Sequence, residues 1–312
     1  MAQDYTTTEL VSTVRLRLQM YQSSASFEDS DILTLLNYEL SNTLVPKIME
    51  AHQEYFVDDY DFQSVIGQDA YDLPPRNIGL KLRDFLAINS FTPNILTVPI
   101  RCVNPEDITG TYGNPGYFNE FVSYYHGNQI KLFPKPMQSY TLRMQYFRKP
   151  NYLVDPSECA QITGIDRVNN IVYAPVPSTW TTANTVDVVG SQPPSFNLNA
   201  RDVSIVSISS PTIVVSSTDG MNIGDWICLA QEAPVLMLPE IFRDCLIWST
   251  VVSILAATSD PQTTLAEQIF QGRMELAYVA IVPRTDGEIL KVSSGGVGLA
   301  DYQKIRRYWY YY

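Results

Sequence analysis

The chain has 312 residues, 45% hydrophobic and 17% charged, which excludes a disordered protein and allows one large domain or two ordinary ones. Its 33 acidic residues outnumber 21 basic ones and give a net charge of −12, which argues against nucleic-acid binding through a broad basic face. The four cysteines lie far apart without a CxxC pair, which argues against a zinc ribbon, a thioredoxin motif or a disulfide scaffold and fits a reducing cytoplasm: Cys102, Cys159, Cys228 and Cys245.

Helical spacing dominates the N-terminal part. Thr6 and Glu9 predict a capping box ahead of an apolar stripe at spacing four. Pro46 cannot lie unkinked inside a helix, so a bend is expected just before it. Three helical segments are predicted, over residues 6–21, 29–40 and 47–55.

Alternating, aromatic-rich segments follow and predict strands. Gly127 and Asn128 form a turn signal that joins two of these strands into a hairpin. Asn104 and Pro105 predict the start of a short helix. The strands are expected over residues 55–66, 82–88, 95–101, 117–125, 129–133 and 141–148.

The composition changes again between residues 154 and 234, where short β-branched runs are separated by turn signals. Regular short strands at this spacing predict a small antiparallel barrel or sandwich. The strands are expected over residues 161–165, 171–174, 186–189, 203–208, 213–215 and 226–229.

Helical patterns return over residues 239–257 and 260–281, the second opened by Asp260 and Pro261. A Gly- and Ser-rich stretch at 293–298 predicts a flexible linker before an aromatic end.

The predicted fold class is α+β. Helices from both ends form a helical bundle on a β platform, because an isolated N-terminal helix is not stable alone, and a small antiparallel β barrel or sandwich is inserted. Four parts are expected: residues 1–153 hold the N-terminal helices and platform, 154–234 the inserted β domain, 235–292 the C-terminal helices that complete the bundle, and 293–312 an extended aromatic tail.

Candidate chemistry is sparse. His52 and His126 fit no metalloprotease pattern, and neither a P-loop nor a GxSxG elbow is present. Asp58, Asp59 and Asp61 lack the glycine and final glutamate of a calcium loop, and a strand sends alternate carboxylates to opposite faces, so a solvated acidic edge is favoured. We expect no enzyme activity, no metal and no cofactor. The longest nearly apolar run, residues 246–257, is too short to span a membrane, and no signal peptide is expected.

Two sets of basic residues suggest contacts. Those scattered among the predicted strands favour intersubunit or surface ion pairs: Arg83, Arg101, Arg143, Arg148 and Lys149. The C-terminal set favours docking to a partner protein, with a stacking platform for nucleic acid as the alternative. Its predicted partner-binding residues are Arg306, Arg307, Tyr308, Trp309, Tyr310, Tyr311 and Tyr312.

Several sequence segments resemble the core of tailed-phage neck proteins, the head-to-tail connectors that act as adaptor or portal-proximal rings. They are residues 54–61, 71–79, 81–84, 125–130, 132–134, 142–150 and 224–228. The resemblance covers roughly residues 1–292 and implies a structural virion protein in the neck. It also implies a homo-oligomeric ring of about twelve copies that docks to the portal, contacts other neck or tail proteins and lets genomic DNA pass.

Two other classes stay open. One is a tail or baseplate component that uses the inserted β domain to bind a receptor or ligand. The other is an unrecognised enzyme, such as a carboxylate-dependent hydrolase. A closed ring with an axial channel would favour the adaptor, and a glycan-binding monomer would favour the tail component.

Overall fold

In the computed structural model residues 1–281 form one compact unit. The structure describes residues 5–20, 27–91, 94–106, 108, 121–191 and 197–281. The predicted linker at 293–298 and the aromatic tail lie outside the described residues. The predicted α+β class is confirmed.

The predicted helices are present, most of them with ends shifted by a few residues. Helix α6 begins after Asp260, whose carboxylate accepts a hydrogen bond from the Gln262 N–H at 2.8 Å. The helices are α1 (Thr7–Met20), α2 (Asp29–Glu39), α3 (Val45–Ala51), α5 (Ile241–Ala257) and α6 (Thr263–Ile281). The third predicted helix is wrong at its end, because it stops at Ala51 and a 3-10 turn follows over Gln53–Phe56.

Pro46 is accommodated by a π-helical turn, Leu40–Leu44, that joins α2 to α3. The Val45 N–H bonds the Leu40 carbonyl, which is the wider spacing of a π turn. Proline has no N–H to donate, and at the start of α3 that loss removes little. The helical path therefore continues through the predicted bend.

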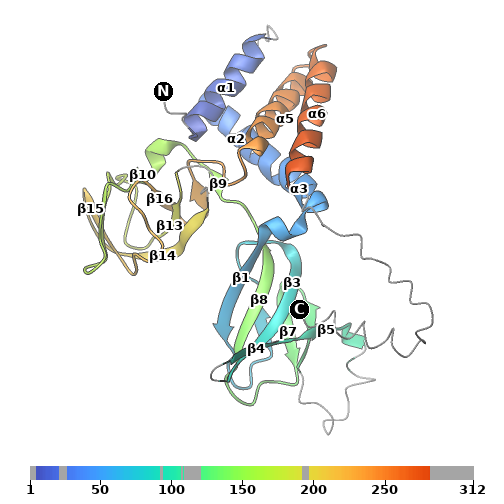
Figure 1. The fold of residues 1–312 in the computed structure, drawn as a ribbon, viewed down its shortest axis with the longest axis vertical. Helices are drawn as coiled ribbons and strands as arrows, with labels where there is room; N and C mark the ends of the chain where they lie inside the picture. Colours follow the sequence, from blue (N-terminus) through green and yellow to red (C-terminus); the bar gives the residue numbers. More distant parts are fainter. Residues whose placement is uncertain are drawn as a thin grey trace, which may run out of the picture. The chain divides into compact units, whose positions relative to one another are not determined.

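Helices from both ends of the chain share one hydrophobic core. Helix α5 contacts α1 and α2 as well as α6, which runs beside it (Figure 1). Val14, Leu36 and Leu246 are fully buried in this core, and Met274 is almost so. The core also takes in Leu153 but no residue from 154 to 235.

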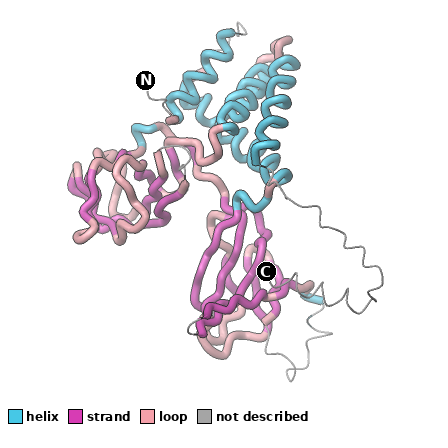
Figure 2. Tube along the Cα trace, viewed as in Figure 1, coloured by secondary structure: helices cyan, strands magenta, loops and turns pink. Residues whose placement is uncertain are grey.

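The predicted β platform consists of two four-stranded sheets (Figure 2). The first has the order β1 (Val57–Gln63), β8 (Thr141–Arg148), β3 (Asn77–Phe91) and β4 (Asn94–Pro99). The second has the order β2 (Ala70–Asp72), β7 (Gln129–Phe133), β6 (Val122–His126) and β5 (Arg101–Cys102).

The two sheets share an apolar core in which Met144 and Leu142 of β8 pack with Ile130 of β7. Alternate residues of β8 are buried, as its sequence pattern predicts. The predicted hairpin is confirmed, since His126 pairs with Gln129 across the two-residue turn.

The insert forms a seven-stranded sheet in which all the pairs are antiparallel. Its order is β10 (Ala160–Gln161), β16 (Trp226–Leu229), β13 (Thr185–Val189), β14 (Leu198–Ser209), β15 (Thr212–Val215), β12 (Ile171–Tyr173) and β11 (Gly164–Asp166). Its hydrophobic core contains only residues of the insert, among them Val172, Val186 and Ile227.

A small antiparallel barrel or sandwich was predicted; the antiparallel strands are present, but they do not close into a barrel in the part of the chain that the structure describes. The two edge strands, β10 and β11, are consecutive and separated only by Ile162 and Thr163. Ile162 bonds the β16 side of the sheet, and Thr163 bonds Tyr173 on the β12 side. One short chain segment therefore serves both edges, and no ladder of hydrogen bonds closes the sheet between them.

The insert is attached through two short strands that pair in parallel, β9 (Tyr152–Leu153) and β17 (Glu232–Ala233). The Val154 N–H donates to the Ala233 carbonyl at 3.0 Å. The chain thus enters and leaves the insert at neighbouring points. We call this β9–β17 pair the stem of the insert.

Candidate functional site at the base of the insert

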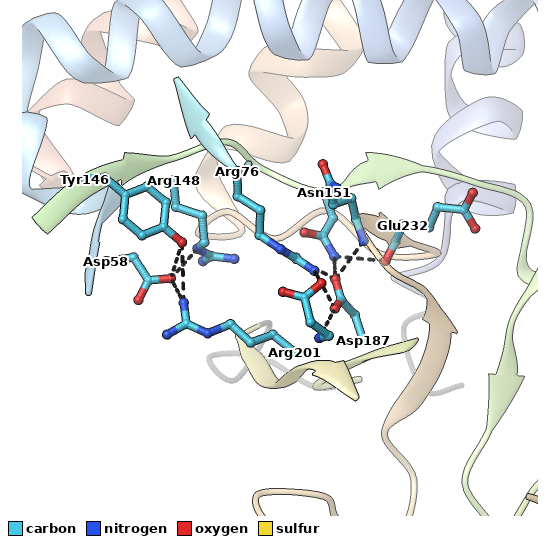
Figure 3. A network of polar contacts seen from close by, with 10 residues as sticks. Asp58, Arg76, Tyr146, Arg148, Asn151, Asp187, Arg201 and Glu232 are labelled. Carbon is cyan, nitrogen blue, oxygen red and sulfur yellow. Dashed lines mark hydrogen bonds and ion pairs between the residues drawn. The ribbon is translucent and has the colours of Figure 1, made fainter. Parts of the chain in front are cut away.

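A buried ion pair joins the platform to the insert (Figure 3). Arg76, just before β3, donates from both terminal nitrogens to the two carboxylate oxygens of Asp187 in β13, each at 2.7 Å. Arg76 also contacts Asp202 at 2.6 Å. The Arg76 side chain is 3% exposed and that of Asp187 is 0% exposed. Bidentate geometry of this kind fixes orientation as well as distance.

Asp187 is the centre of this group. Besides Arg76, its carboxylate accepts hydrogen bonds from the Asn151 side chain at 3.0 Å and from two backbone N–H groups. These belong to Asp202 at 3.0 Å and Gln231 at 2.8 Å. A buried carboxylate is tolerated when it is paired and its oxygens are hydrogen-bonded, which is the case here.

The two backbone donors have an unusual conformation. Asp202 has φ of 50° and Gln231 has φ of 69°. Both values lie in the left-handed region, which residues other than glycine disfavour. This conformation costs about 1–2 kcal/mol per residue. It turns both N–H groups toward Asp187, so hydrogen bonds to a buried charge offset the strain.

Burial by itself lowers the pKa of Arg76, but hydrogen bonds and charge from Asp187 and Asp202 outweigh it and raise the pKa. The guanidinium therefore stays charged. Its Nε has no hydrogen-bond partner.

A second contact lies beside the first (Figure 3). Arg201 of β14 pairs with Asp58 of β1 at 2.6 Å and donates to the Asp59 carbonyl at 2.8 Å. Arg148 lies 3.5 Å from the same Asp58 carboxylate, and the Tyr146 hydroxyl is also 3.5 Å from it. Burial lowers the pKa of Arg148, an effect that Asp58 opposes. The insert thus reaches the platform through Asp187 and through Arg201.

The N-terminal helices bind the stem of the insert. Thr7, the first residue of α1, donates its N–H to the Pro234 carbonyl and its hydroxyl to the Val154 carbonyl, both at 2.7 Å. Asn37 of α2 exchanges two hydrogen bonds with the Leu153 backbone, each at 2.7 Å. Both borders of the insert are therefore bound to helices as well as to each other.

The platform surface carries exposed ion pairs. Arg143 of β8 contacts Asp59 at 2.8 Å and Asp61 at 2.7 Å on the neighbouring strand β1. Arg83 pairs with Glu54 at 2.9 Å. The expected solvated acidic edge is therefore an ion-paired one, with Asp59 and Asp61 bonded to one arginine.

The chemical expectations have separate outcomes. Among the residues that the structure describes, no group of three or more acidic, cysteine or histidine side chains could hold a metal ion. No helix in that part of the chain is long and apolar enough to cross a membrane. The predicted partner-binding set lies outside the described residues: Arg306, Arg307, Tyr308, Trp309, Tyr310, Tyr311 and Tyr312. Sequence reasoning did not find Arg76 and Asp187, which lie 111 positions apart.

A family model described as SU10 adaptor protein matches residues 5–175, more than half of the chain. The chain belongs to the SU10 adaptor protein family. The match covers α1 to α3, the platform and the first insert strands. No curated protein matches the chain.

Membership of this SU10 adaptor family makes the chain a phage adaptor, which is a structural component of the virion. Such adaptors are not typically enzymes and interact with other capsid or tail proteins. The arrangement at the base of the insert agrees with this role, because its charged groups bind one another and fix two parts of the chain. The junction therefore holds these two parts of the chain together.

Proposed function

We propose that this adaptor forms a homo-oligomeric head-to-tail connector ring in the phage neck, docked to the portal and enclosing part of the DNA channel. The observation that carries the proposal is the family match over residues 5–175. The matched range includes the platform segments whose sequence resembles neck proteins. The proposed ring is closed, contains about twelve copies and contacts further neck or tail proteins.

Charge supports a channel through which DNA slides. The net charge is −12. Among the described residues, eight arginines are ion-paired to carboxylates of the same chain and are less available to phosphate: Arg15, Arg76, Arg83, Arg143, Arg148, Arg201, Arg243 and Arg273. Since each neutralised phosphate adds salt-dependent affinity, we expect the ring to bind duplex DNA no tighter than about 10⁻⁴–10⁻⁶ M at physiological salt. Submicromolar binding with a steep salt dependence would contradict this.

The aromatic tail is the proposed anchor on a neighbouring subunit or the portal. Six of the last eleven residues are aromatic, and Arg306 and Arg307 stand among them. Aromatic residues and arginine dominate interface energetics. Truncation after Leu299 should abolish co-sedimentation with the portal, and unchanged co-sedimentation would remove the tail from the proposal.

The insert is proposed as a module that faces neighbouring ring or tail proteins. Its hydrophobic core and the helical core have no residue in common. Exposed apolar side chains on it offer contact points: Val168, Val206 and Ile223 are 90%, 60% and 68% exposed. Deletion of 156–233 with a short linker should leave a cooperative melt of the rest, and loss of that melt would make the insert part of the core.

The decisive experiment is native mass spectrometry of the purified full chain, alone and with its portal, followed by negative-stain imaging. A closed ring with an axial channel that binds the portal is the expected result. A monomer that binds glycan through the insert would favour the tail or baseplate function instead.

A further inference from the structure

Two buried cysteines far apart in the sequence lie opposite each other at the base of the insert. In the β10–β16 ladder Ala160 pairs with Ile227, so the same antiparallel register places Cys159 opposite Cys228. Cys159 has extended backbone, with φ of −113° and ψ of 171°, and therefore continues the direction of β10. Both are free thiols, 5% and 0% exposed.

The hydrogen-bond pattern identifies which kind of pair this is. On the far side of β16, Ala230 donates to the Thr185 carbonyl, so the backbone groups of Cys228, two residues earlier, also face β13. The Ile162 N–H bonds the Asp225 carbonyl, which gives the same alternation on the β10 side. Cys159 and Cys228 thus form a non-hydrogen-bonded pair, in which Cα atoms are about 4.5 Å apart and side chains are closest. That separation lies at the short end of the range that disulfides span.

The two side chains share one face of the sheet, because directly opposed residues of an antiparallel pair do so. Ile227 packs in the core of the insert, whereas Cys228 packs on the other face with Cys159 and the border residue Val154. Burial raises the pKa of Cys228 well above its usual range, and the contact with Cys159 adds to this, so the thiolate is scarce at neutral pH.

We propose that Cys159 and Cys228 are a modification site, a dithiol that is oxidised by a small peroxide to a disulfide that staples the base of the insert. The proposal does not depend on the ring or on the portal. It concerns what happens to a chain that is folded in a reducing cell and is then exposed to an oxidising medium.

The reaction balances with peroxide as the oxidant. The Cys159 thiol, the more exposed of the two, gives up its proton as its sulfur attacks one peroxide oxygen. The O–O bond breaks, the released hydroxide takes up that proton, and a sulfenic acid and one water form. The Cys228 sulfur then attacks the sulfenic sulfur, forms the S–S bond and expels the hydroxyl, which leaves as a second water with the thiol proton. The two thiols lose two electrons and two protons in total, and the peroxide is reduced to two waters.

The disulfide would act at the stem of the insert. Cys159 follows the entry strand β9 closely, and Cys228 precedes the exit strand β17 closely, so the closed loop contains nearly all of the insert. Cys228 is also paired with Asp187 across β13 and β16, beside the buried ion pair. A cross-link here constrains the unfolded insert and should raise its melting temperature.

The test uses the full chain with Cys102→Ser, because Cys102 is exposed and would form intermolecular disulfides. After treatment with dilute hydrogen peroxide, alkylation in denaturant and proteolysis are followed by mass spectrometry. The expected result is a protein lighter by two hydrogens, a peptide pair linked through Cys159 and Cys228, and a melting temperature higher by several degrees that dithiothreitol reverses.

The control is the same protein with Cys159→Ser added, which should show no cross-link and no peroxide-dependent rise in melting temperature. Cys245, buried alone in α5, reports over-oxidation in the same digest. Recovery of both Cys159 and Cys228 in alkylated form, or their separate oxidation to sulfinic acid, would overturn the proposal.

Discussion

The platform surface and the base of the insert use the same bond in opposite environments. Arg143 and Asp61 are 31% and 46% exposed, whereas Arg76 and Asp187 are 3% and 0% exposed. Exposed pairs contribute about 0–1 kcal/mol, but removal of one partner from a buried pair costs about 3–5 kcal/mol. The number of ion pairs in the chain therefore says little about stability. Burial of the partner decides.

The largest effect is expected from Asp187→Ala. It removes the bidentate partner of the buried Arg76, which keeps only the half-exposed Asp202, and it removes one acceptor of Asn151 and the acceptor of two backbone N–H groups. The free energy of unfolding should fall by about 3–5 kcal/mol in a denaturant titration. Asp61→Asn is the matched control at an exposed pair, and an equal loss from both variants would contradict the comparison.

A double-mutant cycle sharpens the assignment to one bond. Arg76→Ala combined with Asp187→Ala should destabilise less than the sum of the single variants, with a coupling of about 0.5–3 kcal/mol. The same cycle on Arg143 and Asp61 should give about 0.2–1 kcal/mol. Additive losses at Arg76 and Asp187 would mean that the two side chains act independently.

Arg201→Ala tests the half-exposed contact. It removes the ion pair to Asp58 and the hydrogen bond to the Asp59 carbonyl, while Asp58 keeps Arg148 nearby. We expect a loss of about 1 kcal/mol, since the Arg201 side chain is 40% exposed. Raising the salt concentration should shrink this loss and leave that of Asp187→Ala nearly unchanged.

The smallest effect is the pH dependence at Asp61. Hydrogen bonding to Arg143 holds the pKa of Asp61 below its ordinary value. The contribution of this pair is therefore present above the unfolded pKa of about 3.9 and is lost as the pH falls through the folded one. Arg143→Ala should flatten the acid side of the stability curve by less than about 1 kcal/mol, measured by thermal melts from pH 5 to 2. A steepened curve would reverse the sign.

Elements defined by local pattern were predictable from the sequence. The apolar stripe of α1, the alternation of β8 and the Gly127-Asn128 hairpin each follow from neighbouring residues. The π turn before Pro46 was not predictable, because a proline in a helical pattern indicates a break.

The base of the insert was out of reach for a different reason. Arg76 and Asp187 are 111 positions apart in the sequence. The residues around each of them do not indicate which strands will pair. Asp202 and Gln231 adopt left-handed backbone without being glycine, so no turn signal marks them. Cys159 and Cys228 become partners only through the register of β10 with β16. The proposed disulfide between Cys159 and Cys228 and the ion pair between Arg76 and Asp187 both depend on pairing between distant strands.

The parallel pairing of β9 with β17 has a consequence for inheritance. Because the chain enters and leaves the insert at neighbouring points, an ancestor could gain, lose or exchange the insert without re-routing the rest of the chain. Arg76 limits that freedom, since its counter-charge Asp187 belongs to the insert. Lineages that have lost the insert should also have replaced this arginine, so the two positions are expected to change together over evolutionary time.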